Sequence, residues 1–222
     1  EPPVRAFIMG TNEWKAGNEW PFPETKFTPF YLHENGLLSE HEHWSYEGSD
    51  SFEESPWMRG SVMYSTPPLV ENTEVAGPIA LKLYAATTDT DVHWIVTLYE
   101  IDPQGMIQRK LTKGWLRGSH RELDLKQSKP WEPIHTHAKS EPLTPGKIYE
   151  FDIKLISTGN LFRAGTRIGL RISCVDDEPK NPLELIGSGS IRRTAVARVT
   201  VFHNEDYPSY LLLPITRGNV LN

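Results

Sequence analysis

The sequence has 222 residues, a formal net charge of −6 at pH 7 and a pI near 5.8. This charge argues against a nucleic-acid partner, because phosphate binding needs a basic stripe and the sequence contains none. No run of 18 apolar residues is present, which argues against a transmembrane helix. The single cysteine excludes an internal disulfide and fits a reducing compartment such as the cytoplasm, although many exported bacterial proteins also lack cysteine.

The first 61 residues differ in composition from the rest of the chain. Residues 4–10 read as a strand, whereas residues 11–61 place tryptophans and prolines among acids, serines and glycines. Because so few regular elements could not enclose a core, we expect 1–61 to be a linker segment and an aromatic-rich, mostly irregular arm packed on the domain that follows. The strand-like opening suggests a piece cut from a longer polypeptide.

Residues 62–222 carry the clearest strand signals, because apolar side chains recur there at every second position. The segments with this pattern are 78–86, 92–99, 149–155, 167–174, 196–202 and 210–215. No segment of twelve or more residues shows the 3.6-residue spacing of an amphipathic helix. The sequence therefore predicts an all-β fold, with a jelly-roll β-sandwich over 62–222 and the irregular N-terminal arm before it.

Two kinds of polar cluster contain residue types that bind metal ions. His41–His43 and His135–His137 have His-x-His spacing, but a zinc site needs a third ligand, and a bare pair carries little information. The acidic residues lack the Asp-x-Asp-x-Asp-Gly loop of a calcium site; they are Asp89, Asp91, Asp176, Asp177 and Glu178. We expect no metal and no cofactor. Cys174 continues the alternation of its strand, so we expect a buried thiol.

No serine in the sequence has glycines two residues to either side, so the Gly-x-Ser-x-Gly elbow of an α/β-hydrolase is absent. Several segments nevertheless resemble the C-terminal domain shared by X-Pro dipeptidyl-peptidases, cocaine esterase-like acyl hydrolases and α-amino-acid ester hydrolases. These segments are Tyr64–Leu69, Thr73–Pro78, Asp89–Val92, Leu98–Gly105, Gly114–Glu122, Leu143–Glu150, Phe162–Ile168 and Tyr207–Pro214. Each motif alone is weak, but their number and order are specific. With residues 3–10 upstream, the resemblance covers nearly the whole chain.

The resemblance implies a jelly-roll sandwich of galactose-binding-like shape that carries no catalytic residue. It also implies a partner, the α/β-hydrolase domain of the same polypeptide, whose Ser-His-Asp triad lies upstream of these residues. We therefore expect this chain not to be an enzyme by itself and its parent to be a serine hydrolase that acts on acyl ester or peptide bonds. The parent's substrate and any self-association stay open. The competing interpretation is a free-standing carbohydrate-binding module of the same shape.

Tryptophans and arginines are the candidate contact residues for the partner domain. Trp14 and Trp20 lie in the arm that the resemblance places next to the catalytic domain, and Trp115 precedes Arg117 and Arg121. A domain separated from its partner exposes aromatic side chains that the interface would bury, and interface hot spots favour tryptophan and arginine. We expect at least two of the three tryptophans to be exposed. The indoles could instead stack on sugar rings, and the arginines could form salt bridges at a strand edge.

Overall fold

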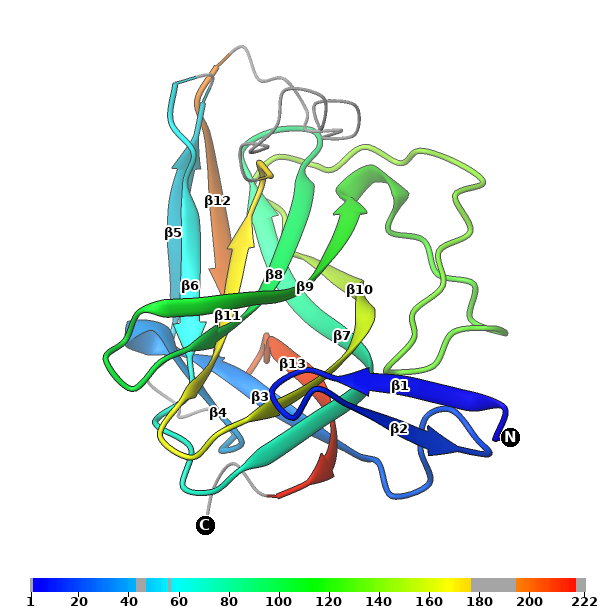
Figure 1. The fold of residues 1–222 in the computed structure, drawn as a ribbon. Helices are drawn as coiled ribbons and strands as arrows, with labels where there is room; N and C mark the ends of the chain where they lie inside the picture. The colour runs from blue at the N-terminus through cyan, green and yellow to red at the C-terminus, as the bar shows by residue number, and fades with distance from the viewer. Residues whose placement is uncertain (1, 43–46, 56, 177–194, 219–222) are drawn as a thin grey trace.

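The computed structural model describes residues 2–42, 47–55, 57–176 and 195–218 (Figure 1). Within these ranges the chain forms strands and two 3-10 turns, and no α-helix. The strands are β1 (Val4–Ile8), β2 (Glu13–Gly17), β3 (Lys26–His33), β4 (Leu37–Ser39), β5 (Ser49–Glu54), β6 (Ser61–Ser65), β7 (Thr73–Thr87), β8 (His93–Ile101), β9 (Ile107–Arg117), β10 (Tyr149–Phe162), β11 (Arg167–Ser173), β12 (Ala197–Phe202) and β13 (Tyr210–Arg217). The turns are η1 (Glu34–Gly36) and η2 (Gly118–His120). The prediction of an all-β fold is confirmed.

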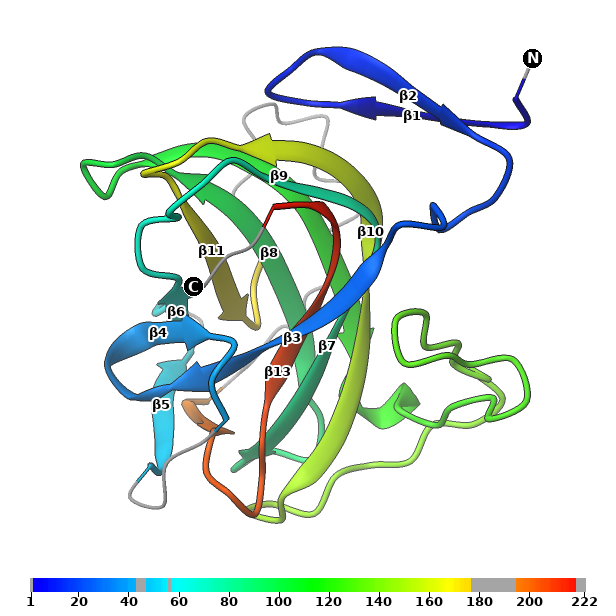
Figure 2. The ribbon, with the colours of Figure 1, turned by 90° about the horizontal axis from the view of Figure 1, so that it is seen from below.

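The main sheet folds into two layers around a common interior (Figures 1 and 2). Its strand order is β10-β9-β8-β11-β6-β4-β3-β13-β7-β12-β5, and a further pairing of β10 with β7 closes a ring. The ring has two weak links, because β9 and β10 share the single pair Gly114–Leu155, and β4 and β6 share only Leu37–Ser65. The layers are therefore β9-β8-β11-β6 on one side and β4-β3-β13-β7-β10 on the other, which is the predicted sandwich.

Alternation along the strands points one face of each layer into a shared core. On β7 and β10, Leu81 lies opposite Ile153 and Leu83 opposite Phe151, and all four side chains are buried. Trp94 of β8 reaches Phe151 from the other layer, with ring centroids 5.2 Å apart. Burial of a side chain of this size contributes about 1.5–3 kcal/mol. This interior holds the two layers together despite the weak links.

Residues 11–61 are more regular than we expected. They contain β3, β4 and β5, which belong to the main sheet: β3 pairs with β13 and β5 pairs with β12. Strands β3, β4 and β5 therefore contradict the expectation that this segment is mostly irregular. The sequence does not indicate these strands clearly, because apolar and polar residues do not alternate there. β3 carries a proline, Pro29, and Phe52 is the only apolar side chain that β5 buries.

Candidate docking surface

The hairpin of β1 and β2 forms a separate two-stranded sheet beside the sandwich (Figure 2). Its inner face belongs to a small apolar cluster made by Val4, Ala6, Ile8, Phe22, Ala76 and Leu161. Two backbone hydrogen bonds fix the end of β1 to β10, from the Met9 nitrogen to the Gly159 carbonyl (2.9 Å) and from the Leu161 nitrogen to the Met9 carbonyl (2.8 Å). The hairpin is therefore anchored, and its outer face has a defined direction.

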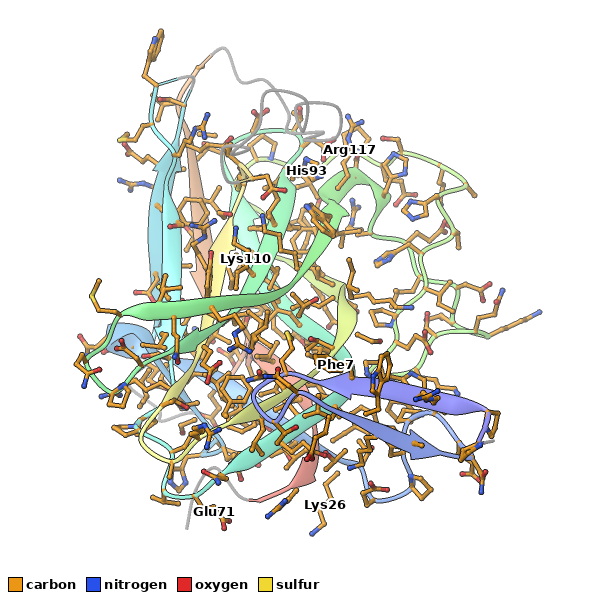
Figure 3. The ribbon with its side chains drawn as sticks, viewed as in Figure 1. Phe7, Lys26, Glu71, His93, Lys110 and Arg117 are labelled. Atoms are coloured by element: carbon orange, nitrogen blue, oxygen red, sulfur yellow. The ribbon has the colours of Figure 1, made fainter. Side chains whose placement is uncertain are left out.

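The outer face of this hairpin is aromatic and exposed. Phe7 and Trp14 lie opposite each other in the ladder, with ring centroids 5.4 Å apart in an edge-to-face arrangement. Trp14 is 61% exposed and Phe7, labelled in Figure 3, is 41% exposed. The Arg5 guanidinium lies 5.2 Å from the Trp14 ring centroid, which is a cation–π geometry. We call Arg5, Phe7 and Trp14 the hairpin face, a preordered apolar surface edged by one positive charge.

A groove of about 380 Å³ lies between the hairpin and β10, and both Phe7 and Trp20 line it. Its far wall is Ser157, Thr158 and Gly159, where β10 has a bulge between Leu155 and Thr158. Ile156, at the start of this bulge, continues the outward face of Asp152 and Lys154 and is 61% exposed. Trp20 is 42% exposed and packs edge-on against Phe22, with ring centroids 5.4 Å apart. The groove extends the hairpin face with a concave apolar edge.

Trp115 and Arg117 lie together on the outer face of β9. Trp115 is 45% exposed and its Nε1 donates a hydrogen bond to Asp176 Oδ2 (3.3 Å). Arg117 Nε donates to Asp91 Oδ2 (2.7 Å). Figure 3 shows Arg117 well away from Phe7, and among the described residues no hydrogen bond or ring contact joins Trp115 or Arg117 to the hairpin face. The structure therefore divides the predicted contact residues into two groups.

Asp91 is the anchor that holds Arg117 in place. Its Oδ1 accepts hydrogen bonds from the backbone nitrogens of Val92 and Ser119, both at 2.9 Å, and its Oδ2 accepts from the Ser119 hydroxyl at 2.8 Å. Burial raises the pKa of Asp91, but the hydrogen bonds from Arg117 and Ser119 outweigh burial and hold the pKa below its usual value. Asp91 thus shapes the turn before a buried strand.

Arg121 makes its contacts within the chain. Its Nη1 donates to the carbonyl oxygens of Gly118 (3.2 Å) and Glu141 (2.7 Å). The guanidinium also lies 4.5 Å from the ring centroid of Tyr149. Arg121 therefore links the start of the long connection between β9 and β10, at Gly118, to its later part at Glu141 and to the first residue of β10, Tyr149. Sequence spacing alone does not reveal these contacts, because the three partners are separated along the chain.

A buried acid–imidazole–hydroxyl arrangement occurs at the end of β3. His33 Nδ1 lies 2.7 Å from Glu47 Oε1, and His33 Nε2 lies 3.4 Å from the hydroxyl of Ser39. The order resembles a catalytic relay, but Nε2 also lies 3.0 Å from the carbonyl oxygen of His41. A carbonyl can only accept, so Nε2 carries a proton and cannot remove one from Ser39. Ser39 is 4% exposed, and the arrangement serves the fold.

The histidines after β9 cluster without forming a metal site. The ring centroid of His137 lies 5.6 Å from that of His120 and 5.9 Å from that of His135. Burial first, and then the charge of His137, lowers the pKa of His135 to about 4. Within the described part of the chain, no three His, Cys, Asp or Glu side chains are arranged to hold a metal ion. His43, Asp177 and Glu178 lie outside the described residues.

Two further expectations concern the thiol of Cys174 and membrane-spanning helices. The Cys174 side chain is buried, as the alternation of its strand predicts. Across the described ranges, the structure has no helix with the length and hydrophobicity that a membrane span requires.

Known proteins resemble this chain along almost its whole length. Residues 1–212 match the family model described as the X-Pro dipeptidyl-peptidase C-terminal non-catalytic domain. The chain is 24% identical to the cocaine esterase of Rhodococcus sp. (strain MB1 Bresler), and the match covers 97% of this chain and 42% of that protein. It is 30% identical to a putative serine esterase of Mycobacterium bovis, over 79% of this chain and 33% of that protein.

Solved structures share the fold. A CocE/NonD family hydrolase from Staphylococcus aureus superposes with a TM-score of 0.81 at 23% identity, covering 98% of this chain and 42% of that one. An α-amino acid ester hydrolase superposes with a TM-score of 0.76 at 20% identity, covering 96% and 41%. The chain therefore spans less than half the length of these relatives.

Proposed function

Because the chain belongs to the family of X-Pro dipeptidyl-peptidase C-terminal non-catalytic domains, we propose that it packs on the α/β-hydrolase domain of the same polypeptide and stabilises or covers it. The whole protein in this proposal is a serine hydrolase that cleaves acyl ester or peptide bonds through a seryl intermediate. The names of the relatives support this, since they include a cocaine esterase and a putative serine esterase. The chain contributes contact surface to that enzyme and no catalytic group.

The observation that carries the proposal is the anchored hairpin with its aromatic outer face. Exposure of Phe7 and Trp14 to water is unfavourable, yet the hairpin holds both rings outward on a fixed backbone. Contiguous exposed apolar surface of this kind marks interaction sites, and a preordered face loses little entropy on binding. We assign the contact to Trp14 and Trp20, with Trp115, Arg117 and Arg121 as the second group.

The proposal is tested by removing indoles from the full-length hydrolase. Trp14→Ala and Trp20→Ala should each lower its melting temperature while leaving kcat unchanged, because truncating an interface hot spot costs about 2 kcal/mol or more. The same substitutions in the isolated 222-residue chain should have a small effect, since both rings are exposed there. Trp57→Ala is the matched control, because Trp57 is 86% exposed in the turn between β5 and β6, outside the hairpin face.

The competing function gives a different result in the same variants. If the domain is a carbohydrate-binding module, the isolated chain binds polysaccharide and Trp14→Ala or Trp20→Ala abolishes that binding. The full-length variants would then melt like the wild type. A normal melting temperature together with lost glycan binding would replace the docking proposal with the carbohydrate one.

A further inference from the structure

A second groove, of about 590 Å³, lies on the outer face of the layer β9-β8-β11-β6. We call it the methionine groove. Its apolar lining comes from Met63 of β6, Ile101 of β8, and Met106 and Ile107 of the β8–β9 connection and β9. Three of these side chains are exposed, Met106 at 67%, Ile107 at 50% and Met63 at 38%. Its volume lies within the range of about 300–1,000 Å³ that ligand sites occupy.

One wall of the methionine groove is a rigid turn. The Asp102 nitrogen donates to the Met106 carbonyl (2.9 Å), and Asp102 Oδ1 accepts from the nitrogens of Gln104 (3.0 Å) and Met106 (2.8 Å). Ile101 packs over Gly169 of β11, where a Cβ would lie 2.6 Å from Ile101 Cδ1. The backbone of the groove is therefore preformed, while its methionine side chains can adapt to the shape of a ligand.

The groove contains one charged side chain. Of the residues that line it, only Arg167 is charged, and Ser65 is the polar side chain beside it. Arg167 Nη1 donates to the carbonyl oxygen of Thr66 (3.0 Å), which holds the guanidinium in position. An arginine presents several donors in a planar fork that matches a carboxylate. The methionine groove, which is apolar except for Arg167 and Ser65, is therefore complementary to a molecule that has an aliphatic chain and one anionic group.

We propose that the methionine groove binds an unbranched aliphatic carboxylate of medium chain length. The hydrocarbon chain lies along Met63, Met106 and Ile107, and the carboxylate accepts hydrogen bonds from the Arg167 guanidinium. The proposal is independent of docking through the hairpin face, since the two surfaces share no lining residue.

The first test is calorimetric titration of the 222-residue chain with decanoate below its micelle-forming concentration. One site should saturate, and affinity should rise by up to about fourfold for each methylene added from octanoate to decanoate. Decanol and decyltrimethylammonium should bind at least about tenfold more weakly. Decanol lacks the negative charge and the second acceptor oxygen of a carboxylate, and decyltrimethylammonium has no acceptor and carries a positive charge. Equal binding of the acid and the alcohol would overturn the proposal, and so would the absence of saturable binding.

Variants locate the site. Arg167→Gln should weaken decanoate at least about tenfold, whereas Arg163→Gln, which removes a nearby arginine outside the groove, should bind as the wild type does. Ile107→Asn should also weaken binding, and Leu125→Asn, at an 83% exposed residue elsewhere, should not. Unchanged affinity in both Arg167→Gln and Ile107→Asn contradicts the assignment.

Methionine oxidation supplies a readout in the unmodified protein. Hydrogen peroxide transfers an oxygen atom to an exposed thioether, giving sulfoxide and water. Bound decanoate should slow this reaction at Met63 and Met106 but not at Met58, which is 47% exposed and lies outside the groove. Equal protection at Met58, or none at Met63 and Met106, would show that decanoate does not occupy the groove.

Discussion

Gly114 of β9 lies opposite Leu155 of β10 in the single ladder pair between these two strands. A Cβ at Gly114 would lie 2.4 Å from the Lys154 carbonyl oxygen and 3.0 Å from the Leu155 Cα, both backbone atoms. The two layers approach each other at this edge only because residue 114 has no side chain. The contact also lies just before the bulge of β10.

Gly114→Ala is therefore expected to destabilise the chain. The added methyl group must displace backbone, and overpacking of this kind costs about 1–3 kcal/mol. Urea unfolding of the isolated chain measures the change. Gly48→Ala is the matched control, because the nearest atom to a Cβ there is Glu34 Oε1 at 3.9 Å. Equal midpoints for the two variants would show that the contact between β9 and β10 accommodates a side chain at residue 114.

The second contact group is tested by Trp115→Ala and Arg117→Ala in the full-length hydrolase. If β9 contributes to docking, each variant should lower the melting temperature while kcat stays unchanged. In the isolated chain Arg117→Ala should lower the free energy of unfolding by less than about 1 kcal/mol. The Arg117 side chain is 56% exposed, so water screens its ion pair with Asp91. An equal loss in both proteins would assign Arg117 to the fold of the domain rather than to docking.

Stability of the isolated chain should depend on pH through His135. Its pKa is about 4 in the folded state and 6.5 for the unperturbed group, so the unfolded chain binds more protons between these values. The free energy of unfolding is therefore highest above about pH 6.5, and it decreases as the pH falls toward 4 and the unfolded chain takes up the proton. After allowance for solvent screening we expect about 1–2 kcal/mol.

Denaturant midpoints measured from pH 4 to 7 check this prediction. His135→Asn should flatten the pH dependence, because the titrating group is gone. His41→Asn is the control, since His41 is exposed and its contact with His33 uses the backbone carbonyl. A slope that survives in His135→Asn would place the proton uptake on another group.

The buried pair of His33 and Glu47 should matter far more than a surface pair. Their side chains are 0% and 1% exposed, so Glu47→Ala leaves an imidazole buried without its acid and should cost about 3–5 kcal/mol. Glu53→Ala removes the exposed 3.5 Å contact with Arg198 and should cost less than about 1 kcal/mol. Chemical denaturation compares the two directly, and similar losses would mean that His33 finds another partner.

How far alternation predicts the fold depends on the strand. Segments 149–155 and 210–215 lie within β10 and β13. Their inward residues face one core and are Phe151, Ile153 and Leu155 of β10, and Leu211, Leu213 and Ile215 of β13. Alternation does not reveal β9, where Lys110 and Lys113 fall among apolar residues and two register shifts in its pairing with β8 change which face is inward. Closure of the ring through β7 and β10 depends on contacts between distant residues, which a local pattern does not specify.

Some residues of the candidate docking surface can also be predicted from the sequence, and others cannot. The hypothesis of a partner interface predicts that at least two of Trp14, Trp20 and Trp115 are exposed, and all three are, at 61%, 42% and 45%. Phe7 cannot be placed from sequence, since its outward direction depends on the register that sets it opposite Trp14. Ile156 continues the outward positions of β10 after Lys154, and its exposure follows from that alternation. Whether these side chains contact a catalytic domain stays a prediction.

The pairing of β3 with β13 has a consequence for synthesis of the protein. β3 ends at His33, while its ladder partner begins only at Tyr210. During translation β3 therefore emerges with an unpaired edge, and the second layer cannot be completed until the ribosome has made almost all of these residues. Long-range pairing of this kind folds slowly and leaves strand edges open to misassociation. Chaperone dependence of the nascent chain is thus expected to end only when β13 leaves the exit tunnel.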